Sequence, residues 1–198
     1  MAIDMAVTVS IRLARREDLP RIVEVYNQAI ASKSSTADLS PFRPEDRQSW
    51  FAEHTPEKYP IFVAEVEGKV AGWCSLSPYR SGRMALRFTS EISVYVGQAF
   101  HRRGVATRLI SHAIAESPRL EIETLFGILL EKNIASRQMM EKMGFQQWGF
   151  LPRVADFDGE ECAHLYYGKR VWDVEPTGSA KPRDSVATGC REAQARGA

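Results

Sequence analysis

A basic turn near the middle of the chain has the residue types that bind an anion. Residues 88–96 alternate as a strand does, and residues 103–116 have the apolar spacing of a helix. Between them, Gly104 and the small Ala106 let the backbone approach a ligand closely. The free N–H groups of the first helical turn and the positive end of the helix dipole point to the same place. The turn therefore predicts a phosphate site, and a solvated basic turn is the alternative reading.

Two neighbouring side chains, Arg102 and Arg103, add positive charge to this turn. The turn is not a Walker loop, because no Gly-Lys-Ser/Thr triplet follows it. It also lacks the three-glycine spacing of a dinucleotide-binding fingerprint. A phosphate ligand of another class is therefore expected here.

Strand and helix patterns alternate along the chain and would position the turn between layers. The expected strands cover Val7–Leu13, Ile61–Val66, Lys69–Leu76, Phe88–Val96 and Ile122–Leu130, with two closing strands in Phe145–Phe157 and Cys162–Trp172. Helices are expected after an N-cap at Asp18, from Pro44, over Arg103–Glu116, and over Asn133–Met143 with Gly144 as the left-handed cap. This interleaving predicts a mixed α/β layer fold.

Length and charge exclude several classes of function. The chain has 198 residues, with 26 Lys and Arg against 25 Asp and Glu, so no excess of positive charge would draw it to nucleic acid or to an anionic membrane. No apolar stretch approaches the roughly 20 residues that span a bilayer, and residues 1–10 lack the basic start of a secretory signal. Three widely spaced cysteines fit neither a disulfide framework nor a zinc site. We expect a cytoplasmic protein that binds no metal.

The composition changes once, after residue 172. Residues 173–198 contain Pro, Gly, Ser, Ala and charges of both signs, and no aromatic residue. Such a segment buries too little apolar surface to offset the entropy lost on ordering. We therefore expect one domain over residues 8–172 and a disordered tail over residues 173–198.

Three motifs together resemble the GCN5-related N-acetyltransferase (GNAT) family. Residues 101–106, His-Arg-Arg-Gly-Val-Ala, are similar to its acyl-CoA signature, Gln/Arg-x-x-Gly-x-Gly/Ala, with His101 at the first position. Asn133-x-x-Ser136, followed by Glu-Lys-Met-Gly-Phe, is similar to its second CoA motif. Residues 89–96 follow the Thr-x-Glu-x-x-Val-Tyr-Val pattern of the phosphinothricin and methionine sulfoximine acetyltransferase branch. The resemblance, over about residues 10–172, implies a central mixed, mostly antiparallel sheet flanked by helices.

The resemblance also implies how acetyl-CoA would be bound. The backbone of Val94, Tyr95 and Val96 would meet the pantetheine arm as an added strand does. Asn133 would hydrogen-bond the pantetheine with help from Ser136, and a plain helix N-cap is the alternative for Asn133. The pyrophosphate would lie on a cradle formed by Arg102, Arg103, Gly104, Val105, Ala106 and Thr107.

In the resembling branch a glutamate is the proposed base, and Glu91 occupies its position. An alkyl amine has a pKa of about 10, so a base must remove its proton before it attacks a thioester. The alternative for Glu91 is a surface carboxylate on a strand. Met140 stands where many members have a tyrosine acid, and Tyr166 or Tyr167 could replace that group.

Fewer residues in the sequence indicate where the acceptor amine would bind. The branch has a Lys/Arg pair at the places of Arg80 and Arg83, and a guanidinium suits a carboxylate or phosphinate. Thr36 lies in a segment that resembles the first substrate loop of the branch. Among the histidines, His164 is the one expected to face a site, whereas His54 and His112 have the pattern of surface or helix-face residues.

These observations predict an acetyl-CoA-dependent N-acetyltransferase that acts on a small amino acid or an amino-acid-like toxin. A protein or peptide acetyltransferase is the first alternative, and an acyl-CoA-binding domain without turnover is the second. The resemblance further implies a homodimer, because two subunits of that branch pair near their closing strands. The closing region here is rich in large apolar side chains: Trp148, Phe150, Leu151, Tyr166 and Tyr167.

Overall fold

The computed structural model describes residues 8–172 of the chain. The disordered tail predicted for residues 173–198 lies outside the described residues, and so does the start of the first expected strand. That strand, β1, is described from Val9 to Leu13.

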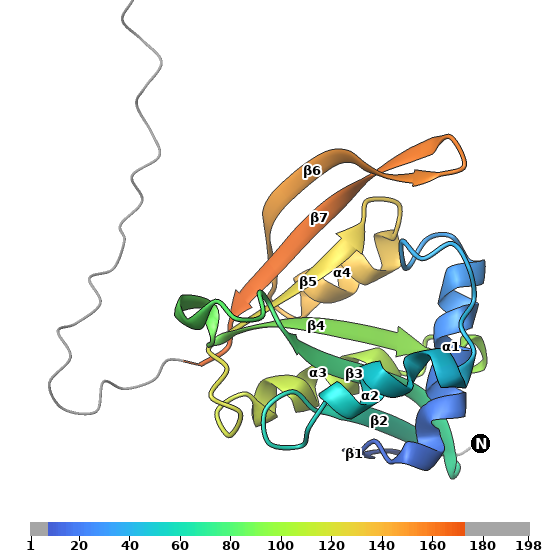
Figure 1. Cartoon of the computed structure of the whole chain (residues 1–198), viewed down its shortest axis with the longest axis vertical. Coiled ribbons are helices and arrows are strands. Elements are labelled where there is room, and N and C mark those ends of the chain that lie inside the picture. The colour runs from blue at the N-terminus through green and yellow to red at the C-terminus, as the bar shows by residue number, and fades with distance from the viewer. Residues whose placement is uncertain (1–7, 173–198) are drawn as a thin grey trace, which may run out of the picture.

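Seven strands form one sheet in the order β1-β2-β3-β4-β5-β7-β6 (Figure 1). Every neighbouring pair is antiparallel except β4 and β5, which are parallel. This confirms the predicted mixed, mostly antiparallel sheet. The strands after β1 are β2 (Ile61–Val66), β3 (Lys69–Pro78), β4 (Thr89–Val96), β5 (Thr124–Leu130), β6 (Gln146–Phe157) and β7 (Glu160–Arg170).

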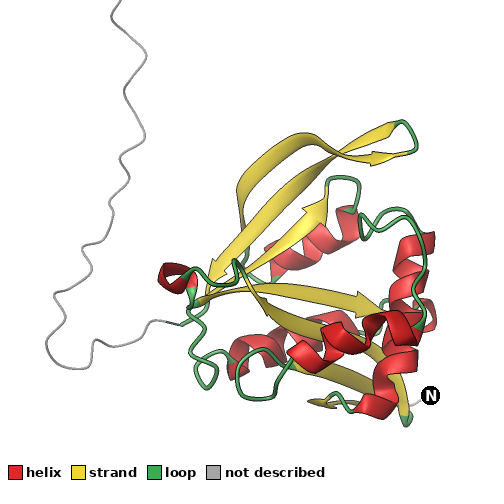
Figure 2. Ribbon diagram, viewed as in Figure 1, coloured by secondary structure: helices red, strands yellow, loops and turns green. Residues whose placement is uncertain are grey.

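Helices cover both faces of the sheet (Figure 2). On one face, apolar residues of α1 pack on Val63 and Trp73, and Trp50 of α2 joins them at the edge. On the other face, residues of α3 and α4 enclose a larger core that includes Phe62 and Leu125. The helices are α1 (Leu19–Ala31), α2 (Gln48–Glu53), α3 (Val105–Glu116) and α4 (Ile134–Lys142), with 3-10 turns η1 (Arg16–Asp18), η2 (Pro44–Arg47), η3 (Met84–Leu86) and η4 (Gln98–Phe100).

Asp18 occupies the N-cap position of α1, as predicted, but its side chain does not cap that helix. Its carboxylate accepts hydrogen bonds from both terminal nitrogens of Arg12, at 2.7 and 2.9 Å, and from the backbone N–H of Arg15. These bonds, led by the one from Arg12, lower the pKa of Asp18. Arg12 also contacts Glu65, so this ion-pair network ties β1 to both α1 and β2.

The pairing between β4 and β5 is short. Only three residue pairs join the two strands, and the last of them is Glu91 with Phe126. Beyond this point β4 stays paired with β3, and β5 stays paired with β7. The two strands therefore diverge, and Figure 1 shows the sheet opening as a V between them.

Within residues 8–172 no helix is long and apolar enough to cross a membrane.

Candidate functional site

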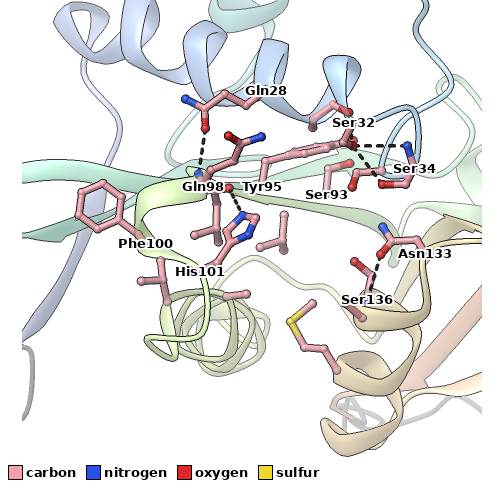
Figure 3. A pocket seen from close by; sticks show the side chains of 18 of the residues that line it. Gln28, Ser32, Ser34, Ser93, Tyr95, Gln98, Phe100, His101, Asn133 and Ser136 are labelled. Atoms are coloured by element: carbon pink, nitrogen blue, oxygen red, sulfur yellow. Dashed lines mark hydrogen bonds between the residues drawn. The ribbon is translucent and has the colours of Figure 1, made fainter.

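A groove of about 500 Å³ occupies the opening between β4 and β5. Its walls come from the C-terminal end of α1 and the loop after it, from β4, from the turn before α3, from the end of β5 and from the start of α4. Figure 3 shows Ser93 and Tyr95 of β4 on one wall and Asn133 and Ser136 on the facing wall. Segments far apart in the sequence thus form one elongated site.

The open edge of β4 carries the backbone that was predicted to meet an extended ligand. Val94, Tyr95 and Val96 all line the groove, and each pairs with β3 on the opposite side. Because β5 has already diverged, alternate N–H and C=O groups of this stretch face the groove with no strand beside them. An extended amide-bearing chain can add here as a strand.

The predicted anion turn closes one end of the groove. Arg102 and Gly104 both have positive φ, 62° and 76°, so the chain turns sharply before α3 begins at Val105. The lining includes Arg102, Gly104, Val105, Ala106 and Thr107. The N–H groups at the start of α3 have no partner one helical turn earlier, and they suit a phosphate.

Arg103 is the member of the predicted cradle that the structure places elsewhere. It does not line the groove, and its guanidinium lies 5.7 Å from the centre of the Phe100 ring. His101 turns inward instead, and its Nε2–H donates to the carbonyl oxygen of Val96 at 2.9 Å. The imidazole therefore holds the turn against the end of β4 (Figure 3).

Asn133 is the N-cap of α4 and also lines the groove. Its Oδ1 accepts the backbone N–H of Ser136 at 3.1 Å, which makes it the N-cap of α4. Both residues also line the groove, so the side-chain NH₂ of Asn133 remains to donate to a ligand. Met140, at the position of the missing tyrosine, is buried in the core, and Met139 lines the groove instead.

Thr36 lies outside the groove lining and is buried. Its hydroxyl is 2.8 Å from that of Tyr26, which also donates to Asp38 at 2.5 Å. The Tyr95 ring meets Tyr26 edge-on at 4.8 Å, and burial raises the pKa of Tyr95. Thr36 thus supports the side chains behind β4, whereas Ser34 and Ser35 reach the groove.

Glu91 lies at the closed end of the V, in the last residue pair that joins β4 to β5. The alternation of the strand puts it on the same face as Ser93 and Tyr95. The side chain is half-buried, and this burial raises the pKa of its carboxyl. A carboxyl group with a raised pKa at the end of a groove is suited to accept a proton.

Aromatic rings lie beside Glu91. Phe126, its partner on β5, meets Tyr79 edge-on at 4.5 Å and stacks on Tyr166 with the ring centres 6.0 Å apart. Tyr79 begins the loop that carries Arg80 and Arg83, and both arginines are exposed. The structure therefore anchors the start of this loop near Glu91 and leaves the guanidinium groups in solvent.

The two neighbouring tyrosines of β7, Tyr166 and Tyr167, lie on opposite faces of the sheet. Tyr167 is buried in the α3–α4 core and donates to Glu141 at 2.8 Å, so it faces away from Glu91. Tyr166 is the tyrosine on the Glu91 side. His164 is half-buried and lies opposite Leu130, away from the groove lining.

His54 lies closer to Glu91 than its position in the sequence suggested. It was expected as a surface or helix-face residue, but its ring is half-buried and its Nε2 lies 3.2 Å from the Ser77 hydroxyl. Ser77 is the partner of Glu91 on β3. No spacing in the sequence links position 54 to position 91, so this proximity had no local signal.

No cluster of three or more potential metal-ligating His, Cys, Asp or Glu side chains is found among residues 8–172. The candidate site in the described part of the chain is thus built from backbone groups, hydroxyls, one carboxylate and positive charge.

Comparison with known proteins supports the same ligand class. The acetyltransferase (GNAT) family matches residues 20–145. YwnH of Bacillus subtilis (strain 168), which carries the name of a phosphinothricin acetyltransferase, is 40% identical over 163 residues, 82% of this chain and 99% of YwnH. The L-amino acid N-acyltransferase MnaT of Escherichia coli (strain K12) is 30% identical over 145 residues, 73% of this chain and 84% of MnaT.

A solved structure shares the architecture. The yncA protein of Salmonella typhimurium, solved with its cofactor acetyl-CoA, superimposes with a TM-score of 0.79 at 25% identity. The match covers 87% of this chain and 99% of yncA. A groove lined by an open strand edge and a helix start fits the pantetheine and pyrophosphate of acetyl-CoA. The chain belongs to the GNAT family and is an acetyl-CoA-dependent N-acetyltransferase.

Proposed function

We propose that this enzyme transfers the acetyl group of acetyl-CoA to the primary amine of a small amino acid or of an amino-acid-like toxin, of the phosphinothricin or methionine sulfoximine type. The observation that carries the proposal is that Glu91 lies in the last residue pair between β4 and β5, next to Ile92 and Ser93 of the groove lining. The names of its relatives, a phosphinothricin acetyltransferase and an L-amino acid N-acyltransferase, support the acceptor class.

In this proposal the groove residues hold acetyl-CoA. The open edge of β4 at Val94–Val96 pairs with the pantetheine arm, and Asn133 donates to it from the facing wall. The N–H groups at the start of α3 and the Arg102 guanidinium hold the pyrophosphate. A backbone N–H of Tyr95 or Val96 stabilises the negative charge that develops on the thioester oxygen.

Glu91 acts as the general base, directly or through a water molecule. An amino acid arrives as an ammonium ion and cannot attack until it loses a proton. The half-buried carboxyl accepts that proton, and its raised pKa brings it closer to the pKa of the amine. The thiolate that leaves has a pKa of about 8.5 and needs little help from an acid. This accounts for a buried methionine at position 140.

Arg80 and Arg83 bind the carboxylate of the acceptor in this proposal. Their loop starts at Tyr79, which packs on Phe126 beside Glu91. An acceptor that lies on this aromatic wall directs its amine to Glu91 and its carboxylate to the loop. Of the predicted acceptor residues, Thr36 acts indirectly, through Tyr26.

We also propose a two-fold homodimer through the edge strand β6. The exposed apolar side chains on this strand are Trp148 (57%), Phe150 (50%), Leu151 (38%) and Val154 (52%). The expectation that Tyr166 and Tyr167 belong to the exposed patch is wrong, because Tyr167 is buried and Tyr166 is half-buried. An edge strand with such a patch is costly to leave in water. A cytoplasmic location stays a prediction.

The activity itself is tested by thiol release from acetyl-CoA with a panel of amines. We expect release with phosphinothricin, methionine sulfoximine or a proteinogenic amino acid, and none without an acceptor. Release only with peptides would favour the peptide acetyltransferase. Tight acetyl-CoA binding without release with any amine would favour the acyl-CoA-binding domain.

The Gly104→Glu substitution tests the cofactor groove. A carboxylate at the start of α3 repels the pyrophosphate, and φ of 76° is unfavourable for a side chain. We expect acetyl-CoA affinity, measured by calorimetry, to fall at least about 100-fold. Gly68→Glu is the matched control, because Gly68 has φ of 73° and equally open surroundings in the β2–β3 turn. Equal affinities of the two variants would refute the assigned cradle.

The Glu91→Gln substitution tests the base. We expect kcat to fall about 100-fold or more, with acetyl-CoA affinity unchanged. The wild-type rate should fall as pH drops through the pKa of Glu91. Because burial raises this pKa, this acidic limb of the pH–rate profile should lie at higher pH than that of a free carboxyl group. The limb should vanish in Glu91→Gln, whereas the exposed Glu57→Gln control should keep it. A near-wild-type rate in Glu91→Gln would assign the role to another group.

Arg80→Gln and Arg83→Gln test the acceptor contact. Losing a charge-assisted contact should raise the Michaelis constant of the amino acid roughly 10- to 150-fold and leave that of acetyl-CoA unchanged. An amino-acid amide should show the same loss with wild-type enzyme and should not respond to the arginine changes. Arg119→Gln, on the exposed C-terminal side of α3, is the control. Equal use of acids and amides by the wild type would contradict the carboxylate contact.

Light scattering tests the dimer. We expect a dimer at micromolar concentration and a monomer after Phe150→Lys with Val154→Lys, because two charges on each copy cannot be buried unpaired. Leu39→Lys is the control, since Leu39 is 56% exposed but lies far from β6 in the chain. A monomeric wild type would rule the dimer out.

A further inference from the structure

His54 follows the end of α2 and is held in one orientation by two hydrogen bonds. Its Nδ1 lies 2.7 Å from the carbonyl oxygen of Trp50, and its Nε2 lies 3.2 Å from the hydroxyl oxygen of Ser77. A carbonyl oxygen can only accept, so Nδ1 carries the hydrogen of the neutral ring. Nε2 is therefore the basic nitrogen, and the Ser77 hydroxyl donates to it.

Ser77 bonds to this histidine and is also the cross-strand partner of Glu91. The two residues are directly opposite each other on β3 and β4. Opposed residues share a face, with Cβ atoms about 4.5–5.5 Å apart. The neighbour of Glu91 on β5 is Phe126, which is apolar and buried. Within the sheet, Ser77 is thus the polar neighbour of the Glu91 side chain, and its hydroxyl is already bonded to His54.

The proposed function creates a need for such a connection. Each turnover leaves on Glu91 a proton taken from the acceptor amine, and Glu91 must lose that proton before the next acceptor reacts. The carboxyl group is half-buried and lies beside Phe126. We propose that Glu91 passes this proton through the Ser77 hydroxyl to His54, and that His54 releases it to solvent. This inference rests on the proposed function.

The relay moves one proton and restores every group. The Glu91 O–H donates its proton to the Ser77 oxygen while the Ser77 hydroxyl proton passes to Nε2 of His54. Glu91 is then a carboxylate, the Ser77 hydroxyl carries the hydrogen that came from Glu91, and His54 is an imidazolium. Nε2–H gives its proton to water, and the Ser77 O–H then rotates back to donate to Nε2. The Nδ1–H keeps its bond to Trp50 throughout, so the ring need not turn.

The charged groups around His54 suit a proton that passes through. Burial lowers the pKa of His54, the bond to the Trp50 carbonyl and the charge of Glu53 raise it, and the charge of Arg47 lowers it, so that the net shift is downward. Burial also raises the pKa of Glu91. The two pKa values are therefore closer together than those of the free side chains, which favours transfer in either direction. The Trp50 ring, centred 4.8 Å from the imidazole, also packs on Trp73 of β3.

Two substitutions separate a relay from a structural role. His54→Gln keeps an acceptor near the Nε2 position for the Ser77 hydroxyl but cannot titrate, and His54→Ala opens space for free imidazole. With the amino acid that the wild type uses best, we expect kcat to fall about 10-fold or more in both variants, with acetyl-CoA affinity unchanged. Added imidazole should restore kcat in His54→Ala and have no effect on Glu91→Gln.

His112→Gln is the control, because His112 lies on α3 against Phe62, on the opposite face of the sheet. A purely structural His54 would give a near-normal kcat in His54→Gln and no imidazole rescue in His54→Ala. Either result would overturn the relay.

An NMR titration keeps the test independent of the acceptor. If the wild type acetylates no amino acid, the proposed function fails, whereas the coupling of His54 to Glu91 can still be measured. We expect the pKa of the His54 ring to fall in Glu91→Gln, because a nearby carboxylate stabilises the imidazolium. It should not change in the exposed Glu57→Gln variant. An unchanged His54 titration in Glu91→Gln would overturn the relay whatever the acceptor is.

Discussion

The incomplete pairing of β4 with β5 is the constraint on which the rest of the site depends. After three residue pairs the strands separate, each remaining bonded to its other neighbour. The separation leaves backbone groups of β4 without a neighbouring strand, and these groups face the groove. An extended ligand with amide groups can pair with them, so the break in the pairing of the sheet is also a place for a ligand.

The separation of β4 from β5 divides the candidate site into two regions, the groove and the closed end at Glu91. On the groove side, the start of α3 and the N-cap of α4 offer N–H donors to a long phosphorylated thioester. At the closed end, Glu91 lies beside Ser77 and the aromatic wall of Tyr79, Phe126 and Tyr166. In the proposed function, the acceptor and the acetyl donor approach the vertex from different directions, and the Glu91 carboxylate lies where they meet.

The α1 and α2 side of the sheet holds this arrangement in place. Tyr95 packs between Tyr26 and Trp73, and Trp50 packs on Trp73, so the groove wall rests on a continuous aromatic layer. Such packing fixes side-chain rotamers close to the site. It also brings α2 against β3, and this contact places His54 beside Ser77.

The elements and the anion turn could be predicted from the sequence, because strand alternation, helix spacing and cap residues act locally, whereas acetyl-CoA as the ligand was implied by the resemblance of three motifs to the GNAT family. The predicted base and most of the predicted cofactor residues lie on one continuous strand–turn–helix segment, over Glu91, Val94–Val96 and Arg102–Thr107, so the spacing along this segment was enough to predict them together. Only the tertiary structure could show that Thr36 supports Tyr26, that Arg103 lies over Phe100 and not in the groove lining, and that Tyr167 is a core residue. It also brought His54 to Ser77. These outcomes depend on which strands are neighbours and which helix covers them, and contacts between residues distant in the chain leave no periodic signal in the sequence.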